Sequence, residues 1–420
     1  NTTWYLLDIL KSTNNGENWT RLVYIYSYNL LENPDIGIDL YNNNLYVVYE
    51  EAEVGNSSSH DIKIFRYYQW DIIDVDTDMN DQRNPAIAID ATYGSDNNIY
   101  VAYEQIVSHH ESKMIVQKST THGDNWSSWH SRGFFDQKVH TQMDIAVDFS
   151  GQVFLTYAYG ENFSALQRIV VEYGPRDSVN NSFENPWIIY YTTSLRVNHP
   201  VIAVSRSSLI TTKIVVAFEY IWSNPTEYDI MVMSSSDGGV SWVDSYIAYT
   251  FDWEYRPNIV SDGMDMNVSS EEDGNFYLVY TRKFQNVNDS FIILIASYSS
   301  LTSWRRMHTY QGTKNIWNIT KRVFGITAYS NGSNLVVTYK ATSCYGCTDS
   351  QIYSTLISSD TRSSFTITSP NSTTSWTAGT IELITWTYTG DINFVNIFLY
   401  KGDSPLGWIA QGAPNLGYFD

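Results

Sequence analysis

The chain alternates between short hydrophobic runs and polar turns, and one pattern of two such runs recurs six times. In each copy a polar or proline start leads into alternating hydrophobic residues, and a second, nearly unbroken hydrophobic run follows. The alternating run is typical of a strand near a polar surface, whereas the unbroken run indicates a strand buried on both faces. The paired runs are 33–39 with 45–50, 84–90 with 99–104, 144–148 with 153–157, 199–204 with 214–219, 256–260 with 276–280, and 323–327 with 335–339.

The spacing of these pairs predicts an all-β fold, a β-propeller. The first runs follow one another at intervals of about 51 to 65 residues, and this period fits a four-stranded blade with generous loops. Small residues stand between hydrophobic neighbours in the first runs, namely Gly37, Ala88, Ala146, Ala203 and Gly325. Blades converge on a crowded axis where large side chains would collide, so we assign the first runs to the innermost strands.

A second kind of hairpin lies between these pairs, and three of its copies contain the turn Ser-x-[Asp/Asn/Thr]-x-Gly-x-x-Trp. The serine and aspartate side chains can hydrogen-bond turn amides, the glycine supplies a positive φ, and the tryptophan packs the turn against the sheets. The motif residues are Ser12, Asn14, Gly16 and Trp19, then Ser119, Thr121, Gly123 and Trp126, and finally Ser235, Asp237, Gly239 and Trp242.

This turn resembles the Asp-box, or BNR repeat, of sialidase-like propellers, and the resemblance extends over roughly residues 1–365. It implies a propeller over residues 1–364, with the turns on the outer rim in a structural role. Only Asp237 keeps the aspartate of the motif. Six inner hairpins and seven outer ones predict six blades, with residues 1–20 supplying an overlapping strand. A seventh blade follows instead if the N-terminal hairpin completes one whose inner half lies elsewhere.

The sequence pattern changes at Phe365, where the repeat of paired hydrophobic runs ends. Alternating runs at 366–371, 383–387 and 395–402 predict a half-buried antiparallel sheet. The segment resembles the Ser/Thr-rich surface module related to yeast cell-wall glucan-assembly proteins. We therefore expect a partial β-sandwich surface module over residues 365–420.

The net charge limits the partners of the chain. The 25 basic and 45 acidic residues give a formal charge of -20, which would repel nucleic acid and anionic membrane surfaces. No hydrophobic run reaches the length of about 18 residues that a membrane-spanning helix needs. We expect no nucleic-acid partner and no transmembrane segment in this sequence.

Glycosylation signals and cysteines favour an extracellular or cell-surface protein. The two cysteines, Cys344 and Cys347, lie in a polar loop and are interpreted as a small disulfide. The beginning of the chain has no basic or apolar leader and reads as a mature terminus. Eleven Asn-x-Ser/Thr sequons predict N-glycosylation, at Asn1, Asn18, Asn56, Asn125, Asn162, Asn180, Asn267, Asn288, Asn318, Asn331 and Asn371.

The residues of a working sialidase are not found in recognisable form. The resemblance would imply an Arg-Ile-Pro on an inner strand, two further arginines as a carboxylate clamp, an aspartate acid/base and a tyrosine nucleophile with a glutamate partner. No Arg-Ile-Pro occurs in the sequence. The segments most similar to it contain Arg83 and Arg256, each shortly before a proline. No catalytic residue is assigned. The other candidate arginines are scattered along the sequence without the recognisable spacing of a carboxylate clamp; they are Arg66, Arg196, Arg282 and Arg322.

Two sets of carboxylates are weaker candidates for chemistry. Glu50, Glu104 and Glu219 each follow an aromatic residue at the end of a second strand, where they could do acid/base work in another glycoside hydrolase or lyase. The simpler interpretation is a solvated charge at a strand end. Three alternating carboxylates, Asp74, Asp76 and Asp78, would face one way from a strand and form a candidate Ca²⁺ site, with a solvated acidic connection as the alternative.

These observations favour a non-catalytic extracellular protein that forms a surface layer or filament, or binds glycans or proteins through the propeller. Its expected partners are glycans or other surface proteins, including further copies of the chain. The alternative is a sialidase-like carbohydrate-active enzyme, a glycoside hydrolase. A deep pocket with converging arginines and carboxylates would favour the enzyme.

Overall fold

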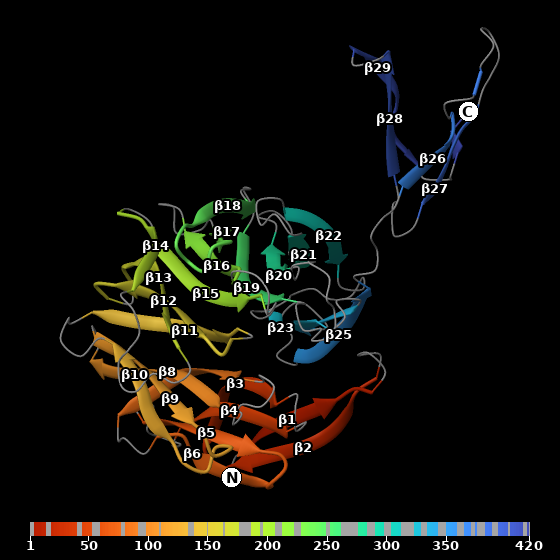
Figure 1. Cartoon of the computed structure of the whole chain (residues 1–420). Helices are drawn as coiled ribbons and strands as arrows, with labels where there is room; N and C mark the ends of the chain where they lie inside the picture. The colour runs from red at the N-terminus through yellow and green to blue at the C-terminus, as the bar shows by residue number, and fades with distance from the viewer. Residues whose placement is uncertain are drawn as a thin grey trace. The chain divides into compact units, whose positions relative to one another are not determined.

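The structure is a computed structural model of the 420-residue chain (Figure 1). It describes residues 4–13, 18–39, 44–52, 59–76, 80–90, 98–108, 111–132, 138–148, 150–162, 164–175, 186–193, 196–205, 212–221, 228–248, 253–261, 276–283, 290–297, 304–311, 323–328, 334–342, 350–358, 365–370, 374–375, 383–388, 394–401, 404–414 and 418–419.

All regular structure in the described residues is β-strand. Five sheets have four antiparallel strands each, joined in chain order. Their strands are β3 (Leu30–Asp39), β4 (Asn44–Ala52), β5 (His60–Arg66) and β6 (Asp71–Asp74); β7 (Asp81–Ile89), β8 (Ile99–Ser108), β9 (Glu111–Ser119) and β10 (Ser127–Arg132); β11 (Val139–Val147), β12 (Val153–Gly160), β13 (Leu166–Gly174) and β14 (Trp187–Tyr191); β15 (Arg196–Val204), β16 (Ile214–Ile221), β17 (Tyr228–Ser235) and β18 (Val243–Ala248); and β19 (Trp253–Ser261), β20 (Phe276–Lys283), β21 (Ser290–Ser297) and β22 (Trp304–Gln311).

The repeated four-stranded sheets confirm the predicted β-propeller. The first strands β3, β7, β11, β15 and β19 each contact the first strand of the next sheet, and β19 contacts β23 (Val323–Ala328). Figure 1 shows the sheets from β3 to β22 following one another around a common centre. Strand β23 continues this order in a three-stranded sheet with β24 (Asn334–Thr342) and β25 (Ser350–Ser358).

The N-terminal hairpin forms a separate sheet of β1 (Tyr5–Lys11) and β2 (Thr20–Ser27). Strand β1 contacts β3, just as the third strand β5 contacts the next first strand β7. This contact places β1 and β2 in the position of an outer hairpin that precedes the β3–β6 blade. The choice between six and seven blades stays a prediction.

Side-chain burial and size match the predicted positions of the strands, with the second strands between blades and the first strands innermost. Strand β16 is buried at all its positions, as an unbroken hydrophobic second strand between two blades requires. In the first strand β3, a Cβ added to Gly37 would lie 2.9 Å from Cδ1 of Ile89 in the neighbouring blade. The small residue there lets the two first strands approach each other closely. The hydrophobic cores likewise join residues of consecutive sheets.

Contacts between residues divide the chain into two units. The first comprises residues 1–331 and 336–356, and the second comprises 332–335 and 357–420. The boundary predicted after residue 364 stays a prediction. In the second unit β26 (Phe365–Ser369), β27 (Ile384–Tyr388) and β30 (Tyr418–Phe419) form one sheet, and β28 (Phe394–Lys401) pairs with β29 (Ser404–Pro414).

Among the described residues, no helix is long and hydrophobic enough to cross a membrane.

Candidate functional site

Each first strand of the five four-stranded sheets contains a β-bulge at the same place. The register with the second strand shifts between Glu32 and Asp35 in β3, and equivalent shifts occur in the other four sheets. One residue in every bulge has a positive φ, which side chains other than glycine adopt rarely. These residues are Asn33 (φ 45°), Asn84 (53°), Gln142 (55°), His199 (46°) and Arg256 (55°). Proline follows four of them and has no N–H to leave unpaired in the interrupted ladder.

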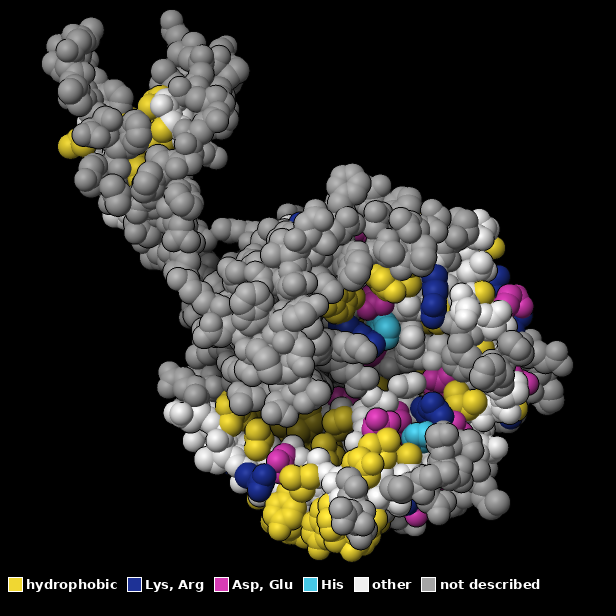
Figure 2. Space-filling model, turned by 180° about the vertical axis from the view of Figure 1, so that it is seen from behind, with side chains coloured by type: hydrophobic (Ala, Val, Ile, Leu, Met, Phe, Trp, Pro, Cys, Tyr) yellow, Lys and Arg dark blue, Asp and Glu magenta, His cyan; other side chains and the backbone are white. Residues whose placement is uncertain are grey.

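The five bulges line one cavity of about 1080 Å³, here called the central cavity. Its wall also contains Asp35, Arg83, Glu104 and Asp144. Figure 2 shows acidic, basic and histidine side chains gathered around a hollow in the described part of the surface. The sequence contained a signal for this site, because a polar residue before a proline recurs at the start of the repeats.

Three buried glutamates connect the bulges of neighbouring blades. Glu50, Glu104 and Glu219 are only 2%, 1% and 2% exposed, so their interpretation as solvated strand-end charges is wrong. Glu50 Oε1 accepts a hydrogen bond of 2.8 Å from Asn33 Nδ2 in its own blade and one from the backbone N–H of Asn84 in the next. Glu50 therefore ties two blades together through two residues of the cavity wall.

The other two glutamates repeat this bridge with different partners. Glu219 is 2.8 Å from His199 Nδ1 in its own blade and accepts the Arg256 N–H of the next blade, also at 2.8 Å. Glu104 Oε2 accepts hydrogen bonds from Asn84 Nδ2 at 3.0 Å and from Thr141 Oγ1 of the next blade at 2.5 Å.

The different partners give the bridging glutamates different pKa values. Burial raises the pKa of Glu104 to about 7, because the two neutral donors compensate only part of the lost hydration. Burial also raises the pKa of Glu50. For Glu219, the charge and hydrogen bond of His199 outweigh burial and lower the pKa below its ordinary value. The cavity wall therefore contains Glu104, an acid that holds its proton near neutrality, whereas Glu219 loses its proton readily and contacts the wall residues His199 and Arg256.

Asp35 and Asp144 occupy the same position in the first and third blades, directly after the bulge. Both are half-buried and line the central cavity. Asp35 accepts the N–H groups of Ile36 at 2.8 Å and of Ile87 in the next blade at 2.9 Å. Asp144 makes the same pair of bonds with Ile145 and Ile202, at 2.8 and 2.9 Å.

The charge of Asp35 also affects the ionisation of Asp144. Burial raises the pKa of Asp144 to about 7, and the negative charge of Asp35 adds to this rise against the opposing bond from the Ile202 N–H. Burial raises the pKa of Asp35 as well. Like charges that cannot both ionise easily give one protonated and one ionised carboxyl over a range of pH. The sequence analysis missed this pair, although both aspartates stand at equivalent points of the repeat.

Two arginines considered in the sequence analysis reach the central cavity. Arg83 and Arg256 line its wall. Arg83 Nε donates a hydrogen bond of 2.9 Å to Asp81 Oδ2, so the positive charge of Arg83 lies beside the carboxylate of Asp81. Arg66 lies in a network between two blades, Arg282 pairs with the buried Glu254 at 3.4 Å, and Arg322 is outside the described residues.

A tyrosine and a glutamate are paired, but away from the cavity. Tyr157 donates a hydrogen bond of 2.5 Å to Glu172, which also contacts His130 and Arg132. Burial first, and then the charge of Glu172, raises the pKa of Tyr157 well above its ordinary value. A nucleophilic phenol needs the opposite shift, so this pair is a buried link between the second and third blades.

The described residues of the repeated Ser-x-[Asp/Asn/Thr]-x-Gly-x-x-Trp motif form hydrogen-bonded turns. Ser119 Oγ accepts the N–H of Gly123 at 2.9 Å, and Ser235 Oγ accepts that of Gly239 at 2.8 Å. Asp237 accepts the N–H of Ser241 at 2.9 Å. In the first copy Ser12 and Trp19 are described, whereas Asn14 and Gly16 are outside the described residues.

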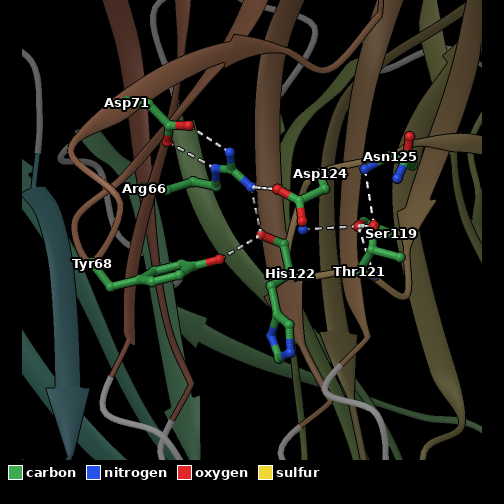
Figure 3. A network of polar contacts seen from close by, with 9 residues as sticks. Arg66, Tyr68, Asp71, Ser119, Thr121, His122, Asp124 and Asn125 are labelled. Carbon is green, nitrogen blue, oxygen red and sulfur yellow. Dashed lines mark hydrogen bonds and ion pairs between the residues drawn. The ribbon is translucent and has the colours of Figure 1, made fainter.

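The second turn is fastened to the preceding blade by Arg66 (Figure 3). This buried arginine of β5 forms bonds of 2.9 and 2.5 Å with Asp71 at the start of β6. It also donates to Asp124 and, at 3.3 Å, to the carbonyl oxygen of His122. Such contacts give the turn a structural role between blades.

The other predicted sites are brought together only in part. Asp74 pairs with Lys63, whereas Asp76 accepts hydrogen bonds from Tyr103 and Gln117, so the two carboxylates have separate partners. Asp78, Cys344, Cys347 and eight of the eleven sequon asparagines lie outside the described residues. Asn18 and Asn125 are exposed and Asn162 is half-buried. The Ca²⁺ site, the disulfide and the glycosylation stay predictions.

The sheets and the cavity define a β-propeller whose central cavity has a wall of carboxyl groups, amides and arginines. No family model and no curated protein matches the sequence. Solved structures that resemble it include an α-L-arabinofuranosidase from Fusarium graminearum in complex with an iminosugar inhibitor (11% identity, 86% of this chain, 99% of that chain, TM-score 0.49). A second is a protein of unknown function from Dyadobacter fermentans (9% identity, 83% of this chain, 97% of that chain, TM-score 0.50). A third is a Hadza microbial sialidase (12% identity, 78% of this chain, 65% of that chain, TM-score 0.46). At these identities the likeness concerns the fold alone.

The third copy of the turn motif, at residues 235–242, provides a test of packing between blades. A Cβ at Gly239 (φ 96°) would lie 2.0 Å from a ring carbon of Trp187 in the preceding blade. We expect Gly239→Ala to lower the free energy of unfolding by about 3 kcal/mol or more. The control Gly238→Ala meets only the backbone strain of its φ of 74° and should cost about 1 kcal/mol. Urea unfolding measures both, and equal losses would contradict the predicted contact.

The buried Glu104 predicts a pH-dependent stability. Its folded pKa of about 7 exceeds its ordinary value of 4.5, so the folded chain binds this proton more tightly than the unfolded chain. The stabilisation is complete below pH 4.5 and is lost as the pH rises through about 7, and it amounts to about 3 kcal/mol. In Glu104→Gln this contribution should be absent, so that urea unfolding shows the variant gaining on the wild type between pH 5 and 8. Glu161→Gln, at an exposed glutamate, should follow the wild type, and the same pH slope in all three proteins would refute the assignment.

Proposed function

We propose that this β-propeller is a glycoside hydrolase that acts in the central cavity. The observation that carries the proposal is the pair Asp35 and Asp144, two half-buried carboxyls that line one cavity. The negative charge of Asp35 helps to raise the pKa of Asp144. Hydrolysis of a glycosidic bond generally uses two carboxyl groups, one protonated and one ionised. A coupled pair with one pKa near 7 meets that requirement.

The two aspartates take different roles in this reaction. Asp144 holds its proton up to about pH 7 and donates it to the oxygen of the leaving sugar. Asp35 is the carboxylate that acts on the other side of the bond, as nucleophile or as base for water. The N–H groups bonded to both residues keep the carboxyl groups in fixed positions.

The remainder of the wall suits a polar ligand. Amide groups from the bulges and the charges of Arg83 and Arg256 face a space large enough for a small oligosaccharide. The arginines would favour sugars that carry a carboxylate. Glycan binding without hydrolysis is the second candidate, because the same wall could hold a sugar without cleaving it. The extracellular location, with glycans as partners, remains part of the proposal through the exposed sequons Asn18 and Asn125.

The function is tested with a panel of 4-methylumbelliferyl glycosides of neutral and acidic sugars. We expect the wild type to release the fluorophore from at least one substrate, with kcat/KM falling as the pH rises through about 7 because Asp144 loses its proton. Asp144→Asn and Asp35→Asn should each lose about 100-fold or more. Asp237→Asn, which removes a carboxyl from an exposed turn, should keep the wild-type rate.

Two outcomes would contradict this assignment. Full activity in both cavity variants would place the chemistry elsewhere. An inactive wild type whose melting temperature rises with an oligosaccharide would instead support the non-catalytic, glycan-binding function.

A further inference from the structure

A second group of polar side chains lies in the β3–β6 blade beside the central cavity. Glu32, Glu50 and His60 each offer one ligand atom, and these atoms lie within 4.8 Å of one another. The group consists of two carboxylates and an imidazole, whereas the Asp pair of the proposed active site contains no histidine.

The register of three adjacent strands brings these residues together. Glu32 in β3 is directly opposite Glu50 in β4. Glu50 is opposite Ile62 in β5, and His60 is two residues before Ile62. Since side chains alternate along a strand, all three point to the same face of the sheet.

Glu50 is arranged to give one oxygen to a further partner. Its Oε1 accepts the bonds from Asn33 and Asn84, whereas Oε2 accepts no hydrogen bond from the described residues. The side chain is 2% exposed and lies beside the carboxylate of Glu32. Two neighbouring carboxylates, one of them buried, are costly unless a positive charge compensates them.

His60 is held in the orientation that a metal ligand requires. Its Nδ1 is 2.6 Å from Asp81 Oδ1, and its backbone N–H donates to the same oxygen at 3.2 Å. A proton on Nδ1 leaves the lone pair on Nε2 for another partner, and an imidazole fixed by a carboxylate in this way is a regular feature of metal sites. The side chain is 7% exposed, and within the described part of the chain no hydrogen bond to Nε2 occurs.

We propose that Glu32, Glu50 and His60 bind a divalent transition-metal ion of the Zn²⁺ class, with Asp81 holding the imidazole. One nitrogen and two carboxylate oxygens suit such an ion, whereas Ca²⁺ prefers oxygen ligands alone. The ion supplies the positive charge that the two carboxylates lack. It joins three strands of the blade and lies next to the cavity wall, because Asn33, Asn84 and Asp81 line the central cavity.

The experiment measures metal binding without any substrate, so its result is independent of the hydrolase proposal. The full chain is dialysed against a chelator, then against zinc and then against metal-free buffer, and zinc is counted by mass spectrometry. We expect one zinc ion per wild-type chain. Cobalt in place of zinc should give visible absorption bands that disappear in His60→Gln.

The variants decide which residues bind the ion. Glu32 is exposed, so Glu32→Gln should fold normally by circular dichroism and bind zinc at least 10-fold more weakly. Glu161→Gln is the matched control, because it removes another exposed glutamate, one that pairs with Lys138, and it should keep the wild-type affinity. Asp81→Asn should weaken binding by about 10- to 100-fold. Absence of zinc from the wild type, unchanged affinity in both Glu32→Gln and His60→Gln, or binding of calcium in preference to zinc would each overturn the proposal.

Discussion

Neighbouring blades of this propeller are joined near the axis by buried carboxylates that accept hydrogen bonds from both sides. A β-bulge interrupts the ladder of each first strand and leaves N–H groups without a partner in the sheet. Glu50 and Glu219 each accept such an N–H from the next blade, and Asp35 and Asp144 each accept a backbone N–H from the next first strand. Since leaving a buried N–H unpaired costs free energy, these bonds fix the position of each of these blades relative to the next one.

The same bonds determine the chemistry of the central cavity. Carboxylates removed from water keep their charge only where a positive partner is near, as His199 is for Glu219. Where the partners are neutral, as around Glu104 and Asp144, the pKa rises toward 7. The ring of bridging acids therefore holds the blades and also supplies proton donors to the cavity.

The outer edges of the blades are joined by different means. There two of the Ser-x-[Asp/Asn/Thr]-x-Gly-x-x-Trp turns contact the preceding blade, through Arg66 for the turn at 119–126 and through Trp187 for the turn at 235–242. One contact is made by the guanidinium of Arg66 and the other by the aromatic ring of Trp187, and both depend on a close fit between the side chain and the turn. Where both kinds of contact occur, between the first and second blades and between the third and fourth, they join the blades at two distances from the axis.

The sequence by itself determined the strands, their order and the inner position of the first strand, because alternation and unbroken hydrophobic runs depend only on which faces of a strand are buried. It also identified the turns, whose hydrogen bonds are local. It did not reveal that Glu50, Glu104 and Glu219 are buried, nor that Asp35 and Asp144 share a cavity with Arg83 and Arg256. Residues more than a hundred positions apart meet there only when the blades close around an axis. Burial and the charge of distant neighbours set the ionisation of these groups, and both arise from the tertiary structure alone.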